Sequence, residues 1–416
     1  MIRWTGIEVA ALRAVHGLSQ VDFAAKAGIA DRTVGYWEQG KATAVLSPRF
    51  ADMMETLLDW LDEEPQQRFY RAIGFRSDGT PMPLDQDTVN CAADSVAFAE
   101  WVANDDPGLI VTNLADQLAS IAQRFVYSAP QPLLHELATL RDRVKKALCT
   151  QPSLHRKREL LFLAGVSIEL LAQVTDNLGD ATSAMEHAMA AELLARKAGH
   201  DGLRAWSAGT RALIAEWNNN PSAAMQFARE ASTWAPPGQH QVRLAALEAR
   251  CCARLGRTTE ARAAIHRAER AADNADTTDE LAAFGGSMRF PTTKLAYYIG
   301  STYRLIQDYP QAEQWALDAI TGYTSGPEES RSYGDEAIAR TDVAIARILT
   351  GAVDGACEIL VPVFTLQPDQ RIYPIVDGMN AVDGALHTTR DVNASIARNL
   401  SQEIAMFTAN ELPALR

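Results

Sequence analysis

Cysteine and histidine side chains are the usual carriers of metal and nucleophile chemistry, and their spacing here supports neither. The five cysteines form no CxxC pair, and they stand at Cys91, Cys149, Cys251, Cys252 and Cys357. This pattern predicts buried free thiols rather than a zinc site or a disulfide framework. The eight histidines never form HExxH, and the sequence lacks GxxxxGK, a GxGxxG loop after a strand and GxSxG. We therefore expect no enzyme, no metal and no cofactor.

The remaining polar side chains must be positioned mainly by helices. Apolar residues recur at spacings of three and four along nearly the whole chain, whereas alternating strand-like runs are scarce, which predicts an all-α fold. A length of 416 residues predicts two or more domains. From the Gly- and Pro-rich interruptions we expect an N-terminal domain over residues 1–73, a linker over 74–95, an intermediate helical segment over 96–153 and a repeat domain over 154–416.

A loose repeat begins near residue 154, in which one helix ends at a Gly or polar turn and the next carries alanines seven positions apart. The alanine pairs are Ala184 and Ala191, Ala261 and Ala268, Ala312 and Ala319, and, in a weaker unit, Ala224 and Ala231. Alanines at this spacing share one helix face and let antiparallel helices approach closely. The pattern resembles the tetratricopeptide repeat, which implies an α-solenoid. The alternative is an alanine-rich bundle without superhelical stacking.

Residues 7–40 carry the most specific local signals in the sequence. Ser19 and Asp22 stand three apart, as in a capping box that opens a helix. Ala24 is small enough for a following helix to cross closely, and Gly28 permits a left-handed turn between the two helices. The core of this segment is predicted to consist of Leu12, Phe23, Ile29, Val34 and Trp37.

This segment resembles the helix-turn-helix of the phage-repressor (Xre-type) transcriptional regulators, on the matches Leu12-Arg13, Gly17-Leu18-Ser19-Gln20, Phe23-Ala24, Ala27-Gly28-Ile29, Thr33-Val34 and Trp37-Glu38-x-Gly40. The resemblance covers about residues 5–60. It implies that a helix at about residues 31–39 enters the major groove of double-stranded DNA. The implied base-facing positions are Asp31, Arg32 and Tyr36, with Gly35 near them. Thr33 and Gln20, each at a helix start, would approach phosphate.

Arg32 is the strongest of these candidates, because a guanidinium can bind guanine O6 and N7 bidentately. Two positions depart from the family pattern. Ala30 stands where the family usually has Ser or Thr, and Asp31 places a negative charge close to DNA. Asp31 can cap the helix or accept a hydrogen bond from cytosine N4, so its role stays open.

The repeat resemblance also implies which side chains face the concave surface of a solenoid. Repeat phase places Glu169, Gln173, Asp176 and Asn177 inward in one unit, Arg243, Arg250 and Arg254 in another, and Lys294, Tyr297, Ser301 and Arg304 in the clearest one. Such a mixture suits an extended ligand such as a peptide, whose carboxylate the cations can bind. The alternative is a solvated face with intramolecular ion pairs.

The order of parts resembles actinobacterial Xre-type regulators with tetratricopeptide bodies, and it is similar in plan to peptide-responsive quorum-sensing regulators. The resemblance implies a sequence-specific transcriptional regulator whose body binds a peptide, a small molecule or a protein partner. One alternative is a repeat scaffold that docks proteins and uses its helix-turn-helix only for localisation or dimerisation. Another is an enzyme with an unfamiliar all-α site.

Charge bears on how such a protein would bind DNA. The net charge is −13, and residues 1–60 carry six Lys/Arg against seven Asp/Glu. Because phosphate contacts need clustered cations, a single near-neutral N-terminal domain, or head, should bind DNA weakly. This implies that a homodimer binds the operator.

The sequence has neither an apolar run long enough to span a membrane nor a signal-peptide layout, so we expect a cytoplasmic protein without membrane partners.

Overall fold

The computed structural model describes residues 4–41, 44–73, 107–150, 152–273, 279–327, 331–388 and 394–409. Within these ranges every regular element is a helix, and the single β-type contact is an isolated bridge between Thr5 and Val45. The predicted all-α class is therefore confirmed. Contacts between Cα atoms divide the chain into two compact units, Met1–Asp105 and Asp106–Arg416. The predicted linker over 74–95, and residues 96–106 of the predicted intermediate segment, lie outside the described residues.

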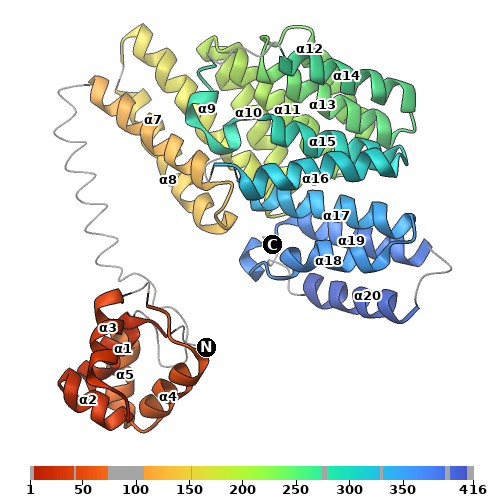
Figure 1. The fold of residues 1–416 in the computed structure, drawn as a ribbon. Coiled ribbons are helices and arrows are strands. Elements are labelled where there is room, and N and C mark those ends of the chain that lie inside the picture. The colour runs from red at the N-terminus through yellow and green to blue at the C-terminus, as the bar shows by residue number, and fades with distance from the viewer. Residues whose placement is uncertain are drawn as a thin grey trace. The chain divides into compact units, whose positions relative to one another are not determined.

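The N-terminal unit contains the helices α1 (Gly6–Val15), α2 (Gln20–Ala27), α3 (Asp31–Gly40), α4 (Pro48–Asp59) and α5 (Glu63–Ala72) (Figure 1). They enclose a separate apolar core that includes Leu12, Phe23, Val34 and Trp37, as predicted, together with Phe69. Ile29 packs against this core but is only partly buried. Trp60, an aromatic residue that would ordinarily pack in a core, is exposed at the end of α4.

The connection from α2 to α3 follows the predicted local chemistry. The Ser19 hydroxyl accepts a hydrogen bond from the Asp22 backbone N–H at 3.2 Å and caps α2. Gly28 ends α2 with φ of 69°, the left-handed conformation that glycine adopts at little cost. The backbone therefore turns sharply, and Ala24 is buried close to the turn.

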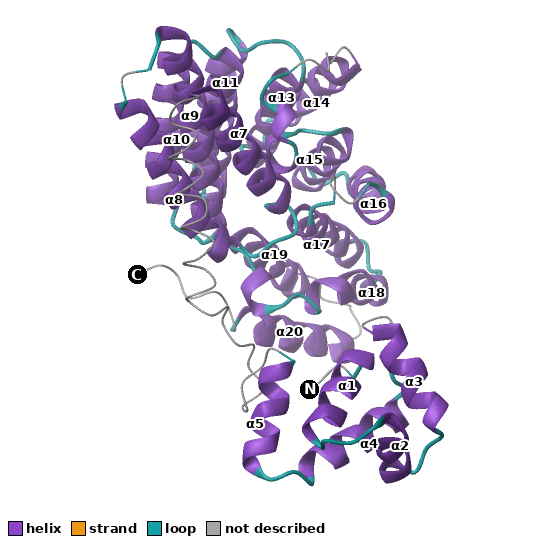
Figure 2. Cartoon of the chain, turned by 90° about the vertical axis from the view of Figure 1, so that its left-hand side faces the viewer, coloured by secondary structure: helices purple, strands orange, loops and turns teal. Residues whose placement is uncertain are grey.

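The second unit begins with α7 (Pro107–Arg124) and α8 (Pro130–Cys149), which contact each other and α9. The following helices pack as consecutive pairs: α9 (Leu154–Asn177) with α10 (Ala181–Ala198), α11 (Asp201–Trp217) with α12 (Pro221–Ser232), α13 (Gln239–Arg254) with α14 (Thr258–Asp273), α15 (Thr292–Leu305) with α16 (Tyr309–Ser325), α17 (Tyr333–Leu349) with α18 (Val353–Phe364), and α19 (Tyr373–Thr388) with α20 (Ala394–Thr408). The first helix of each pair also contacts the first helix of the next, which places these first helices side by side (Figure 2).

The alanines that define the repeat lie where the second helix of a pair meets its neighbours. All eight are buried: Ala184, Ala191, Ala224, Ala231, Ala261, Ala268, Ala312 and Ala319. A methyl side chain lets two helix backbones approach closely, and a larger side chain at any of these positions would have to displace a neighbouring helix. The seven-residue spacing in the sequence therefore corresponds to the packing face of each second helix.

Two short 3₁₀ helices between α14 and α15, Ala282–Phe284 and Gly286–Met288, close the unit against α7. Gly286 has φ of 47°, and a Cβ there would lie 1.9 Å from the carbonyl oxygen of Ala122 in α7. Glycine is required at this close approach, which brings Ser287 next to the end of α7. None of the described helices is both long and apolar enough to cross a lipid bilayer.

The thiols follow the predicted pattern only in part. Cys251 and Cys252 are buried and free, as expected for neighbours in α13. Cys149 is free but exposed at the end of α8, and Cys357 is half-buried. Cys91 lies outside the described residues.

Candidate DNA-binding and effector-binding sites

The side chains of α3 divide between the core and solvent. Val34 and Trp37 are buried, whereas Arg32 and Tyr36 are exposed, Tyr36 by 72%. Positions 32 and 36 are four residues apart and therefore share one face of the helix. Thr33 and Gly35, the other candidates of this helix, are half-buried beside them. The outward face of α3 thus presents a cation, an aromatic ring and a hydroxyl near the start of the helix.

Asp31 is the first residue of α3, and the residue at the N-cap is Ala30, which has no capping side chain. The interpretation of Asp31 as the capping residue is therefore wrong, because the helix begins one residue too early for it. The Asp31 side chain lies outside the described residues. An uncapped helix start leaves backbone N–H groups directed outward, and such groups favour an anion.

A partly buried hydrogen-bond network holds α1, α2 and α3 together. Arg13 Nε in α1 donates to Glu38 Oε1 in α3 at 2.6 Å, and Arg13 Nη1 donates to the carbonyl oxygen of Leu18 at 2.9 Å. Gln20 Nε2, at the start of α2, donates to Glu38 Oε2 at 2.7 Å. Burial alone would raise the pKa of Glu38, but the hydrogen bonds from Arg13 and Gln20 keep the pKa below its usual value. The network fixes how α3 sits on α1 and α2.

Gln20, which the resemblance assigned to phosphate, thus has a second role. Its amide links α2 to Glu38, and its Oε1 lies 3.5 Å from where a Cβ on Gly35 would stand. A larger residue at position 35 would meet this amide. Sequence reasoning missed the contact, because nothing in the local pattern joins residues eighteen apart. The phosphate contact itself stays a prediction.

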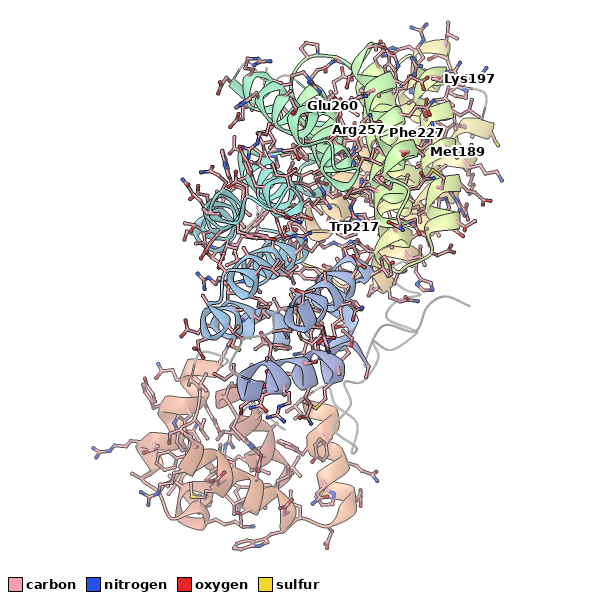
Figure 3. All side chains as sticks on the ribbon, turned by 90° about the vertical axis from the view of Figure 1, so that its right-hand side faces the viewer. Met189, Lys197, Trp217, Phe227, Arg257 and Glu260 are labelled. Atoms are coloured by element: carbon pink, nitrogen blue, oxygen red, sulfur yellow. The ribbon has the colours of Figure 1, made fainter. Side chains whose placement is uncertain are left out.

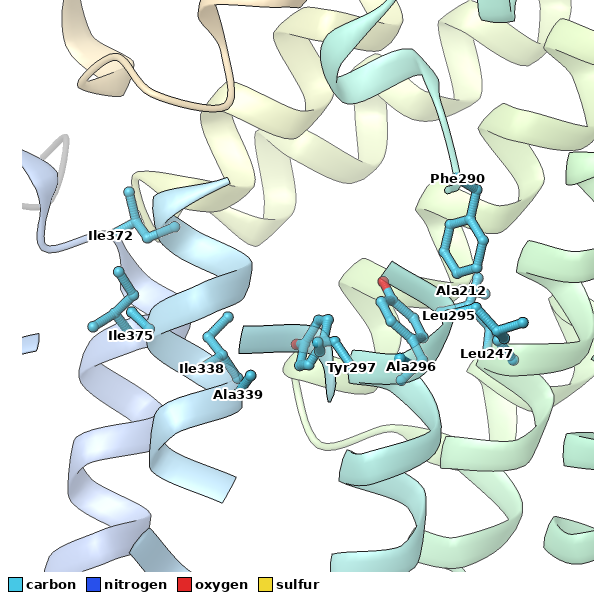
Figure 4. Packing of buried hydrophobic residues seen from close by; sticks show 14 of the residues in the cluster. Ala212, Leu247, Phe290, Leu295, Ala296, Tyr297, Ile338, Ala339, Ile372 and Ile375 are labelled. Carbon is cyan, nitrogen blue, oxygen red and sulfur yellow. The ribbon is translucent and has the colours of Figure 1, made fainter. Parts of the chain in front are cut away.

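In the second unit, a cavity of about 100 Å³ lies on the side formed by the first helices of the pairs. Its polar lining includes Gln173, Asp176 and Asn177 from α9, Arg243 from α13 and Lys294 from α15. Its apolar lining includes Phe125, Trp206, Trp217, Tyr297, Tyr333, Ile338 and Ile372. Figure 4 shows Tyr297, Ile338 and Ile372 on the neighbouring first helices and at the start of α19.

Segments that are distant in the sequence meet around the cavity. The Tyr333 backbone N–H donates to the carbonyl oxygen of Val126 at 3.1 Å, which joins the start of α17 to the end of α7. Trp217 lies toward the middle of this unit, whereas Met189 and Lys197 lie on its outer edge (Figure 3). Four lining residues come from α11, namely Trp206, Thr210, Leu213 and Trp217, and their spacing of three and four residues places them on one face of that helix.

The predicted effector residues divide into two groups. Gln173, Asn177, Arg243, Lys294 and Tyr297 line the cavity, and Arg250, Arg254, Ser301 and Arg304 do not. The second group is occupied by intramolecular partners. Arg250 is only 3% exposed and donates to Glu216 at 3.1 Å and to the Tyr297 hydroxyl at 3.2 Å. Arg254 pairs with the same Glu216 at 2.8 Å.

The remaining cations are paired in the same manner. Arg304 and the buried Ser301 both bind Asp342, and Lys294 Nζ lies 3.2 Å from Asp335 Oδ2. The expected row of ligand-facing cations is therefore found only in part: Arg250, Arg254 and Arg304 lie outside the cavity lining, whereas Arg243 and Lys294 belong to it. All five have intramolecular partners, as charges held between helices require. The alternative interpretation, a face of intramolecular ion pairs, describes these residues.

Arg243 is also held internally. Its Nη1 donates to the carbonyl oxygen of Trp206 at 2.6 Å and its Nη2 to the Thr210 hydroxyl at 2.9 Å, with the guanidinium 4.2 Å from the centre of the Trp206 ring. The buried carboxylate of Glu169 accepts a hydrogen bond from the same Thr210 hydroxyl. Burial raises the pKa of Glu169, and the charge of Arg243 opposes that rise.

Other polar groups in the lining have no partner within the described part of the chain. The indole Nε1 of Trp206 and the hydroxyl of Ser287 are buried without a hydrogen-bond partner. The side chains of Asp176 and Asn177 form no hydrogen bond or ion pair with the described residues. Asp176 is 7% exposed. Burial, followed by the negative charge of Glu216, raises the pKa of Asp176 to about 7. Repeat phase placed Asp176 on this face but did not single it out.

In comparisons with known proteins, no protein-family model and no curated protein matches the sequence.

Proposed function

We propose that the protein is a cytoplasmic, sequence-specific DNA-binding transcriptional regulator. In this proposal residues 4–73 form an Xre-type helix-turn-helix domain, and the paired helices from α9 onward form a tetratricopeptide-like solenoid that binds an effector and mediates dimerisation. Its signalling role would be to convert the effector concentration into operator occupancy.

The observation that carries the proposal is the arrangement of side chains along α3. Val34 and Trp37 hold the helix on the core, while Arg32 and Tyr36 project outward from its first two turns. A recognition helix needs this arrangement, because its N-terminal residues must reach base edges while its rear face stays packed. The Arg13–Glu38–Gln20 network supports the proposal, since it fixes the orientation of α3 before DNA arrives.

Dimerisation is part of the proposal for reasons of affinity. Six Lys/Arg against seven Asp/Glu in residues 1–60 give one head little attraction for phosphate. Two heads joined through their bodies raise affinity by effective concentration, so we expect a palindromic or directly repeated operator. A single half-site footprint by a monomer would contradict this part.

The cavity between the first helices is the proposed effector site. Its volume is about 100 Å³, and a single water needs about 10–15 Å³ of such space, so the cavity holds only several water-sized groups. It therefore suits a small molecule better than an extended peptide. Its mixture of aromatic walls and a few polar groups is typical of ligand pockets.

The test is to incubate the full-length protein with fragmented genomic DNA at low and moderate salt and to sequence what is retained. A regulator should enrich a defined motif, and retention should fall steeply with salt because counterions are released on binding. Retention without a motif, or no retention at any salt, would contradict the proposal and favour a protein-docking scaffold. For Arg32→Ala, the variant that removes the strongest base-reading candidate, Arg196→Ala is the matched control, because it also removes one exposed arginine but lies in α10.

A further inference from the structure

Each cation around the cavity has an acidic group nearby, but not every acidic group has a cation. Arg243 has the buried Glu169 near it, and Lys294 pairs with Asp335 at 3.2 Å. Glu216 is bound by both Arg250 and Arg254. The cations that line the cavity are thus already satisfied.

Asp176 is the exception in this lining. The residue as a whole is 7% exposed, and among the described residues its carboxylate has neither a hydrogen-bond donor nor an ion-pair partner. The charge that acts on it is that of Glu216, which is also acidic. A desolvated carboxylate beside a like charge is costly unless a proton or a cation neutralises it.

The cations of the lining are paired whereas Asp176 is not, and this difference favours a cationic ligand over an anionic one. An anionic ligand would have to share Lys294 with Asp335, or Arg243 with the carbonyl oxygen of Trp206 and the Thr210 hydroxyl. A cationic ligand would instead meet a carboxylate that has no partner, with the Asn177 amide as a further lining group that has none. Charge-assisted hydrogen bonds to such a carboxylate are about twice as strong as neutral ones.

The rest of the lining specifies the remainder of the ligand. Phe125, Trp217 and Tyr333 offer apolar surface, and the faces of aromatic rings also attract cations. Within the described part of the chain, Trp206 Nε1 is a buried donor without an acceptor, and the Ser287 hydroxyl is likewise unpartnered. A ligand with one hydrogen-bond acceptor beyond its apolar part would satisfy them.

We propose that this cavity binds a small organic cation, a protonated amine joined to a ring-sized apolar group that carries a hydrogen-bond acceptor, with Asp176 as its counterion. The inference rests on the proposed function only in calling this ligand the effector. The binding itself follows from the unpartnered Asp176, Asn177, Trp206 and Ser287 around one cavity.

The experiment measures binding to the full-length protein by calorimetry, without DNA. The probes are tyramine, 4-(2-hydroxyethyl)phenol and 4-hydroxyphenylacetate, which share a ring hydroxyl and differ mainly in carrying a cation, a neutral group or an anion. We expect tyramine to bind at least about tenfold more tightly than the other two, since a charge-assisted contact replaces a neutral one. Equal affinities, tighter binding of the anion, or no tyramine binding at millimolar concentration would overturn the inference.

Variants test the assigned counterion. Asp176→Asn should remove the preference for the cation, because it keeps the shape of the side chain and deletes its charge. Asp318→Asn, the same change at an exposed position of α16, should keep the preference. A preference that survives in Asp176→Asn would also overturn the inference. If Asp176→Asn does not fold, the charge series on the parent protein decides alone.

The two proposals fail separately. Tyramine binding without motif enrichment would remove the regulator and leave the cation site. Motif enrichment without tyramine binding would do the reverse.

Discussion

Arg13 Nε in α1 and Glu38 Oε1 in α3 lie 2.6 Å apart, and the same carboxylate also accepts the amide of Gln20 from α2. One side chain therefore fixes three helices of the N-terminal unit. Glu38 follows the last core residue of α3, Trp37, so its position also determines the angle at which Arg32 and Tyr36 are presented.

Glu38→Gln should loosen this arrangement without disturbing the core. The change leaves Arg13 without its charged partner, and a lost charge-assisted hydrogen bond of this kind costs about 1–3 kcal/mol. We expect faster hydrogen exchange across residues 6–40 and weaker binding to all DNA sequences alike. Glu64→Gln, at an exposed site in α5, is the control and should change neither. Unchanged exchange in Glu38→Gln would show that the network does not hold α3.

Arg32→Ala and Thr33→Ala separate base reading from phosphate contact. A bidentate guanine contact is worth about 1–3 kcal/mol of discrimination, so Arg32→Ala should weaken the preferred operator by about 5- to 150-fold more than random DNA. Thr33→Ala should weaken both by similar factors, because phosphate contacts carry no sequence information. Titrations with both DNAs at one fixed salt concentration measure the two ratios. Equal losses in Arg32→Ala would make Arg32 a phosphate ligand.

The loop that carries Ser287 should be sensitive to acid through Asp279. Although burial opposes ionisation, the hydrogen bond and charge of His240, 2.9 Å away, lower the pKa of Asp279 from 3.8 to about 2. A lowered carboxyl pKa stabilises the folded state above the unfolded value and is lost as the pH falls through the folded one. Here the contribution is about 2 kcal/mol above about pH 5, falls to about half near pH 3 and is nearly gone at pH 2.

Urea unfolding at pH 5 and pH 3 tests this assignment. The difference in unfolding free energy between the parent and Asp279→Asn should shrink at the lower pH. Asp318→Asn provides the reference, since its carboxylate is exposed and has no ion partner among the described residues. A difference that stays constant between the two pH values would show that the ionised carboxylate contributes nothing.

The sequence predicted those features that depend on neighbours along the chain. Ser19 caps α2, Gly28 turns left-handed and the repeat alanines are buried, because a cap, a turn and a helix face are each determined within about seven residues. Partners on other helices were not predictable in this way. Repeat phase indicated that Arg250 faces inward, but not that Glu216, thirty-four residues earlier, would meet it there. The unpartnered state of Asp176 depends in the same way on every helix around the cavity.

Occupancy of the cavity should change operator affinity although, among the described residues, every one that lines it belongs to the second unit. The lining joins α7, α9, α11, α13, α15, α17 and the start of α19, so a ligand there touches most of the first helices at once. Small rotations at each interface between helix pairs add up along a solenoid, and in a dimer they would alter the spacing of two heads. Typical coupling is about 1–3 kcal/mol, which predicts a 5- to 150-fold change in operator affinity with saturating tyramine.

Linkage supplies the internal check for this last prediction. If tyramine changes operator affinity by some factor, the operator must change tyramine affinity by the same factor, so both titrations are measured on one preparation. Asp176→Asn should bind the operator as the parent does without ligand and lose the response, whereas Asp318→Asn should keep it. Tyramine binding that leaves operator affinity unchanged in the parent would separate the cavity from DNA control and make the regulator constitutive with respect to this ligand.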